Sequence, residues 1–345
     1  MEELALTNLA RPWILARLLT GLAAAGLTLY ALRHALRVLR FWRLGETSEG
    51  QLALERRAEL VAALVQAGLA LAVLGLAILT LGADRSAASI RGAMCAYGVL
   101  ASSPLGFLAL ASGLGTALLA ALWVVFHRLD LRLERPTLTR RKFLALLVLA
   151  PLLAVDQAVF VAFALDLDFG VVATCCSTGL DAGGDAVRGA SAGGRAGLFG
   201  AALALAAGAA LALFWLRRRP AGAAAWTAAG LSLAALVAML PAAVGYVAPH
   251  AYGTPRHLCP FCLLQAEAGY LGWGLFGGLF AGAAFGLGVA LVETQRASSL
   301  EPAAVSGLQR DLGTRGAIAW ATVCLLAAAP VVRWLALTGG ASLFP

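Results

Sequence analysis

Two cysteines separated by two residues give this chain its most reactive segment, which reads His-Leu-Cys-Pro-Phe-Cys over residues 257–262. At this spacing the sulfurs of Cys259 and Cys262 reach each other across one helical turn. The pair can therefore cycle between dithiol and disulfide, or hold a soft metal ion. An apolar run follows directly, and the positive end of a helix that started there would favour the thiolate.

The remaining cysteines are Cys95, Cys324 and the adjacent pair Cys175 and Cys176. Adjacent cysteines close a disulfide only in a strained ring, and strained disulfides are the more oxidising and labile ones. Cys175 and Cys176 are thus poorly suited to a structural disulfide, and their chemistry fits a redox or metal-binding element. Cys324 falls within an apolar run, where we expect a small packing residue.

The composition predicts a membrane protein. Among 345 residues, 61 % are apolar and only 13 % are charged, whereas a soluble protein carries about a quarter charged residues. The mean hydropathy is +0.85. The net charge of +8 is spread over short loops between apolar runs, so we expect a lipid bilayer as the partner and no nucleic acid.

Eight apolar runs are long enough to cross a bilayer, which takes about 20 residues. They cover residues 13–32, 59–82, 103–126, 143–165, 196–216, 222–247, 266–292 and 316–338. We therefore predict an all-α, polytopic helix bundle that forms a single transmembrane domain over residues 1–345. No internal repeat is evident.

The lysines and arginines predict the orientation, because cytoplasmic loops are enriched in them. The loops after the first, third, fifth and seventh runs hold most of these residues, including the cluster from Arg128 to Lys142 and the triplet Arg217-Arg218-Arg219. We predict that these loops are cytoplasmic and that both termini are extracytoplasmic. The expected location is the bacterial inner membrane, with multiple passes.

Residues 33–58 form an amphipathic segment on the predicted cytoplasmic side, where Leu36, Leu39, Phe41 and Trp42 alternate with arginines. Such a segment lies on anionic headgroups as an interfacial helix. A docking surface for a cytoplasmic partner is the other interpretation.

In this topology five cysteines fall on the extracytoplasmic side, although the topology rests on lysine and arginine alone. They are Cys95, Cys175, Cys176, Cys259 and Cys262. The Cys-Pro-Phe-Cys sequence resembles the active-site motif of glutaredoxins. The layout of an extracytoplasmic C-x-x-C pair at a helix end, with further cysteines in other loops, is similar to membrane thiol oxidoreductases of the DsbB and vitamin K epoxide reductase types. Those families have a four-helix core, and this chain has twice as many spans.

The resemblance implies a thiol-disulfide redox protein. Cys259 or Cys262 would exchange with a disulfide of an extracytoplasmic thiol protein. Cys175 and Cys176 would form the second redox couple. Cys95, which has Arg91 nearby to favour its thiolate, would be a resolving thiol. A membrane carrier such as quinone would receive the electrons.

The same residues support a soft-metal alternative, because thiolate, thioether and imidazole ligands select copper, zinc or mercury ions. The donors expected on that side are Met94, Cys95, Cys175, Cys176, His250, His257, Cys259 and Cys262. The adjacent cysteine pair also resembles the membrane cysteine pair of mercuric-ion transport proteins. A third alternative is a non-catalytic membrane subunit with structural disulfides, so the sequence leaves open whether the chain is an enzyme.

Polar side chains within the apolar runs are a separate signal, because an ionisable group in hydrocarbon is costly and usually functional. Asp156 and Gln157 fall near the middle of the fourth run, with Gln66 as a possible partner. Asp156 would lie on the path of a transported ion. Glu267 falls one turn into the seventh run, where it could take a proton from the thiol pair.

Overall fold

The chain is mostly helical in a computed structural model, which describes residues 8–43, 48–134, 137–172, 192–296 and 301–344. In those residues eight helices are long and apolar enough to cross a membrane. The prediction of an all-α, multi-pass membrane protein is therefore confirmed. The chain divides into two compact units, Met1–Ala173 and Thr174–Pro345.

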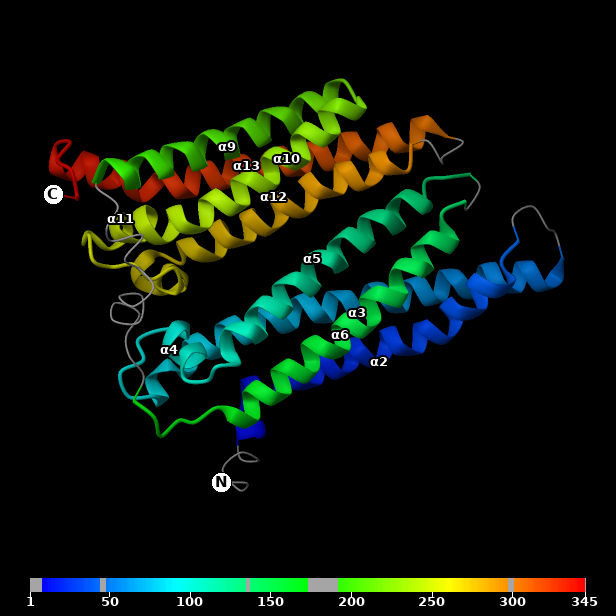
Figure 1. The fold of residues 1–345 in the computed structure, drawn as a ribbon, viewed down its shortest axis with the longest axis horizontal. Helices are drawn as coiled ribbons and strands as arrows, with labels where there is room; N and C mark the ends of the chain where they lie inside the picture. The colour runs from blue at the N-terminus through cyan, green and yellow to red at the C-terminus, as the bar shows by residue number, and fades with distance from the viewer. Residues whose placement is uncertain (1–7, 44–47, 135–136, 173–191, 297–300, 345) are drawn as a thin grey trace. The chain divides into compact units, whose positions relative to one another are not determined.

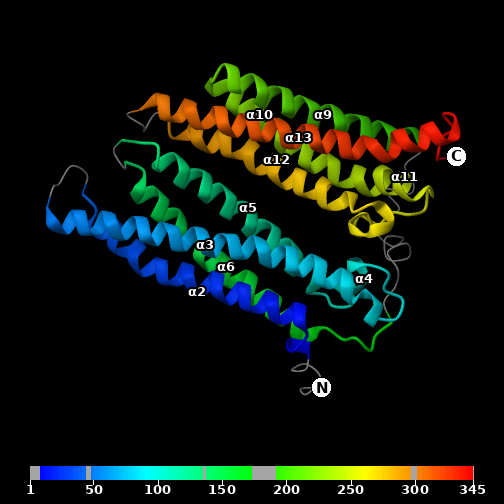
Figure 2. The same cartoon turned by 180° about the vertical axis from the view of Figure 1, so that it is seen from behind.

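The first unit is a bundle of four long helices (Figures 1 and 2). They are α2 (Pro12–Phe41), α3 (Glu49–Ser86), α5 (Gly106–Asp130) and α6 (Thr139–Asp166). Helix α2 packs against α3 and α6, and α5 packs against the same two helices, so the four form a closed ring. The connection between α3 and α5 holds the 3-10 turn η1 (Ala87–Ser89) and the short helix α4 (Ala96–Ala101).

The second unit has the same order of neighbours. Its long helices are α9 (Ala192–Arg218), α10 (Gly222–Ala242), α12 (Leu271–Thr294) and α13 (Pro302–Thr338). Helix α9 packs against α10 and α13, and α12 packs against the same two. The connection between α10 and α12 holds a π-helical turn (Ala243–Val247), α11 (Ala248–Tyr252), and the 3-10 turns η3 (Phe261–Leu264) and η4 (Ala266–Ala268).

Local sequence explains where several helices begin and end. The Ser48 hydroxyl accepts a hydrogen bond from the Gln51 backbone N–H at 3.3 Å and caps α3, as serine commonly does. Proline, which has no N–H to lose, occupies the first position of α2 and of α13. Gly339 adopts the left-handed conformation that ends α13.

Small residues let the long helices approach closely, as is usual in membrane bundles. A Cβ atom at Gly286 of α12 would lie 2.1 Å from the Ser232 hydroxyl oxygen of α10. That serine accepts a 3.1 Å hydrogen bond from the indole of Trp320 in α13, so three helices meet at this glycine. The outer faces instead expose large apolar side chains such as Leu211 and Leu325, which suits contact with lipid.

Two of the predicted runs begin later in the structure than expected, while α2, α3 and α13 extend well beyond the runs predicted for them. The third run was expected to begin at residue 103, but α5 begins at Gly106, because Ser102, Ser103 and Pro104 interrupt helical bonding between α4 and α5. The seventh run was expected to begin at residue 266, but α12 begins at Leu271. Gly269 and Tyr270 have positive φ angles there, which the right-handed helix does not accommodate.

The segment 33–58 is shared between two membrane-length helices. Residues 33–41 are the last turns of α2, and residues 49–58 are the first turns of α3. At about 1.5 Å per residue, both helices are longer than a hydrocarbon core of about 30 Å. Their joined ends therefore extend past the core on the side of the connection.

Candidate thiol site

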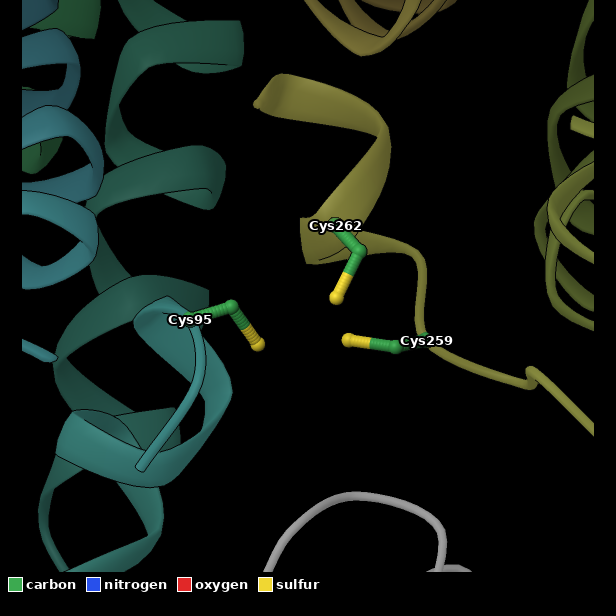
Figure 3. A group of neighbouring side chains, drawn as sticks. All are labelled: Cys95, Cys259 and Cys262. Atoms are coloured by element: carbon green, nitrogen blue, oxygen red, sulfur yellow. The ribbon is translucent and has the colours of Figure 1, made fainter. Parts of the chain in front are cut away.

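The Cys-Pro-Phe-Cys segment lies in the second unit, in the connection from α11 to α12. Cys259 belongs to an irregular stretch and Cys262 to the 3-10 turn η3. Their sulfur atoms lie within 4.8 Å of each other, and the two side chains point toward one another in Figure 3. A disulfide needs the two sulfurs about 2.05 Å apart, so they would have to approach further to form one.

Both sulfur-bearing side chains are buried, with Cys259 at 0 % and Cys262 at 4 % exposure. Burial removes the pair from direct contact with a large soluble protein.

Two aromatic side chains hold the backbone of this segment. The Tyr252 hydroxyl donates a 2.8 Å hydrogen bond to the carbonyl of Cys262, and the Trp273 indole donates one of 3.2 Å to the carbonyl of Leu264. The two residues flank the segment, Tyr252 from the end of α11 and Trp273 from the first turn of α12. The position of Cys262 is thus fixed from both neighbouring helices.

Close backbone contact adds a third restraint. A Cβ atom at Gly272 of α12 would lie 2.8 Å from the carbonyl carbon of Leu263, so only glycine lets the segment lie against this helix. The start of α12 is nine residues after Cys262, not next to it as expected.

The two histidines expected near the motif occupy different environments. The ring of His257 stacks on Tyr252, with centroids 3.9 Å apart and planes 12° apart. His250 donates from Nδ1 to the carbonyl of Tyr246 at 2.8 Å, and its ring contacts Tyr246 and Phe344. His257 therefore contacts Tyr252, whose hydroxyl bonds to the Cys262 carbonyl. His250 instead belongs to an aromatic cluster with Tyr246 and Phe344.

Cys95 lies in the first unit, where it precedes α4 (Figure 3). Its backbone is extended and its carbonyl accepts a 3.0 Å bond from the N–H of Gly98, which starts the short helix. The Cys95 side chain is 2 % exposed, whereas that of the neighbouring Met94 is 69 % exposed. The Cys95 side chain is therefore covered by surrounding residues, whereas the Met94 side chain lies at the surface.

The other cysteines do not enlarge this site in the part of the chain that the structure describes. Cys175 and Cys176 lie outside the described residues. Cys324 is in α13, and its thiol contacts the carbonyl of Leu203 in α9 at 3.9 Å, which fits the packing role expected for it.

Asp156 has a partner that the sequence analysis did not identify. The guanidinium of Arg17 in α2 donates to the Asp156 carboxylate of α6 at 2.6 Å, and also to the Gln157 side-chain oxygen at 3.0 Å. Ser112 of α5 donates to the other carboxylate oxygen at 2.8 Å. The network joins three helices, and its members Arg17 and Asp156 are almost fully buried.

Small residues make room for this network. A Cβ atom at Gly21 would overlap the Gln157 side-chain oxygen, and the Arg17 guanidinium lies 4.8 Å from the centre of the Phe160 ring. Gln66, the partner considered from the sequence, instead bonds to the carbonyl of Ala62 in its own helix. An arginine alone in an apolar run was the available signal, because such a charge requires a partner.

Glu267 lies on the surface of the second unit. It is exposed in the 3-10 turn η4, before α12 begins. The late start of α12 places this carboxylate outside the spanning helix.

Comparison of the chain with protein-family models, curated proteins and solved structures finds no match. Function must therefore be argued from the site itself.

Proposed function

We propose that this chain is a membrane thiol-disulfide redox protein in which Cys259 and Cys262 form the redox pair. The observation that carries the proposal is the closeness of the two sulfurs within one short segment of the second unit. The restraints from Tyr252, Trp273 and Gly272 support it, because a redox pair gains from sulfurs that are held at a constant separation.

Oxidation of the pair balances as two successive exchange steps. One thiolate attacks a partner disulfide, forms a mixed disulfide with one of its sulfurs and releases the other as a thiolate. The second cysteine then attacks the mixed disulfide, closes the Cys259–Cys262 bond and releases the partner's remaining thiolate. The partner gains two electrons, the pair loses two electrons, and the two thiol protons are released to solvent.

In the opposite direction, the Cys259–Cys262 disulfide takes two electrons from a partner dithiol and becomes a dithiol, and a two-electron acceptor must then reoxidise the pair to complete the cycle. A membrane quinone is a suitable chemical class, because it takes two electrons and two protons to become quinol. The lipid environment of the eight helices makes such an apolar carrier accessible.

Cys95 is the proposed exchange partner within the chain. In the described part of the chain, four candidate spans separate it from Cys259, namely α5, α6, α9 and α10. An even number of crossings returns the chain to the side from which it started, so Cys95 and the redox pair face the same side of the bilayer. Because the pair is buried, a thiol of the same chain is better suited than a docked protein to reach it. The parity argument applies equally to Cys175 and Cys176, the proposed second couple.

Soft-metal binding is the second candidate function, and the same closeness of sulfurs favours it. Thiolates select Cu(I) and Zn²⁺, and Cys259 and Cys262 would supply two ligands from one segment. Cys95 is the proposed third ligand. A transport role would also use Asp156, although its carboxylate is already paired with Arg17.

Trapping of a mixed disulfide tests the redox proposal. The variant Cys262→Ser keeps one thiol of the pair, so exchange should stop at the mixed-disulfide stage. We expect mass spectrometry of non-reduced peptides to find Cys259 linked to Cys95, or to Cys175 or Cys176. The matched control Cys324→Ser should leave the Cys259–Cys262 disulfide unchanged. A Cys262→Ser protein with no disulfide-linked peptide after oxidation would overturn the proposal.

A further inference from the structure

Arginines gather at one end of the first unit. The ends of α2 and α5 and the starts of α3 and α6 lie together there, because the four helices alternate in direction around the bundle (Figures 1 and 2). Six exposed arginines define what we call the arginine collar, and they are Arg33, Arg37, Arg40, Arg128, Arg140 and Arg141. This end is the one predicted to face the cytoplasm.

The collar is continuous over two helices. Arg33, Arg37 and Arg40 are spaced four and three residues apart, which places them along one face of α2. Arg140 of α6 donates a 3.1 Å hydrogen bond to the carbonyl of Leu39 in the last turn of α2. The start of α6 therefore lies against the arginine-bearing end of α2.

The charges at the start of α6 oppose the helix dipole. Arg140, Arg141 and Lys142 occupy its first turn, where no acidic residue is present, although cations are unfavourable at this end of a helix. Lys142 is buried and paired with Asp130 at 2.6 Å. Arg140 and Arg141 stay exposed at this helix start, where the helix dipole favours a bound anion.

Apolar side chains alternate with the guanidinium groups. Leu36 is 54 % exposed and Phe41 is 60 % exposed, and both lie among the arginines of α2. A surface of this kind suits the membrane interface, where phosphates lie directly above acyl chains. A soluble acidic protein would meet the charges but would leave the exposed apolar side chains among them unexplained.

We propose that the arginine collar binds the phosphate groups of anionic phospholipids in the adjacent leaflet. The guanidinium groups form paired hydrogen bonds with phosphate oxygens, while Leu36 and Phe41 contact the boundary layer of headgroups. The inference does not depend on the thiol chemistry of the second unit.

Native mass spectrometry of the full chain, titrated with phosphatidylglycerol or phosphatidylcholine, tests the proposal. Each neutralised arginine should weaken phosphatidylglycerol binding about fivefold. For Arg37→Gln/Arg40→Gln/Arg141→Gln we therefore expect a loss of about a hundredfold, with little change for phosphatidylcholine. The corresponding lysine variant should keep most of the binding and shows whether the fold tolerates changes at these positions.

The exposed triplet Arg217, Arg218 and Arg219 of the second unit provides the matched control. Its replacement by glutamine should leave the binding at the collar intact. An equal loss in this control would overturn the proposal, because lipid preference would then follow total charge. Equal affinity for the two lipids in the native chain, or full displacement by inorganic phosphate alone, would overturn it as well.

Discussion

At the scale of single residues, Tyr252 is the strongest link between the redox pair and its surroundings. Its hydroxyl holds the carbonyl of Cys262, and its ring carries the stacked ring of His257. Neither contact involves sulfur directly, so we regard Tyr252 as a positioning residue.

We predict that Tyr252→Phe loosens the segment and destabilises the dithiol form of Cys259 and Cys262, in which this hydrogen bond is present, relative to the disulfide. The lost hydrogen bond contributes about 1 kcal/mol, which corresponds to roughly a fivefold shift in the dithiol–disulfide equilibrium. Equilibration with glutathione buffers measures this shift. Tyr30→Phe in the first unit is the control and should have no effect, and an unchanged equilibrium in Tyr252→Phe would remove the positioning role.

The ion pair between Arg17 and Asp156 makes a second prediction at this scale. Replacement of Asp156 by asparagine leaves a buried guanidinium without its countercharge, and such changes cost about 3–5 kcal/mol. Denaturant titration of the purified protein measures the loss. The double variant Arg17→Leu/Asp156→Leu should recover most of it, because no unpaired charge remains.

A control with Glu59→Gln, an exposed carboxylate of α3, separates a buried-charge effect from a general loss of acidic charge. Equal stability of Asp156→Asn and the native chain would contradict the network as described.

The sequence predicted which residues carry the chemistry but not the residues that position them. The spacing of Cys259 and Cys262 is local, so it can be recognised in the sequence. The contact from Tyr252 and the pairing of Arg17 with Asp156 join residues that are 10 and 139 positions apart. Such contacts depend on how helices rotate about their axes, which composition and hydropathy do not specify.

At the scale of elements, the start of α12 determines where the redox segment lies. Gly272 allows the backbone at Leu263 to approach the helix, and Trp273 holds Leu264 one residue further on. The first turn of α12 therefore forms a platform for the segment.

We predict that Gly272→Ala displaces this segment and destabilises the protein. The added methyl group meets backbone atoms that cannot rotate away, and overpacking of this kind costs about 1–3 kcal/mol. Thermal unfolding measures the cost, and the rate of disulfide closure after oxidant addition measures the displacement. Gly277→Ala in the same helix is the matched control, since a Cβ atom there meets nothing within 4 Å. Similar behaviour of the two variants would contradict the platform.

All eight spans were predictable because long apolar runs are the dominant signal in a membrane protein. The boundary of α12 was not, since residues 266–270 are apolar enough to extend the run but adopt turns and left-handed conformations. The extension of α2 and α3 beyond the hydrocarbon core was also missed, because charged residues continue the helices without extending the apolar runs.

At the scale of the whole molecule, the two units repeat one plan that the sequence does not reveal. Each is a closed ring of four long helices, and in each a cysteine-bearing connection joins the second helix to the third. Each unit has four candidate spans in the part of the chain that the structure describes, and an even number of crossings returns the chain to the side where it began. The architecture therefore predicts that both cysteine-bearing connections face one side.

Labelling of intact cells with a membrane-impermeant thiol reagent tests this topology. In a cysteine-free background, Gly50→Cys at the arginine-rich end should react only after the membrane is permeabilised, because we predict that this end is cytoplasmic. Ala341→Cys near the C-terminus should react in intact cells. The opposite pattern would invert the orientation, and equal labelling would contradict an odd number of crossings between the two positions.

The central claim is that Cys259 and Cys262 cycle between dithiol and disulfide, and a redox titration of the purified chain with metal analysis of the same sample tests it most directly. We predict a reversible two-electron transition that is lost in Cys259→Ser and in Cys262→Ser, with no bound metal needed. A pair that resists oxidation and holds about one copper or zinc ion per chain would contradict the redox account and favour the soft-metal site. Cysteines that remain oxidised under all buffers, without metal, would instead indicate a structural disulfide.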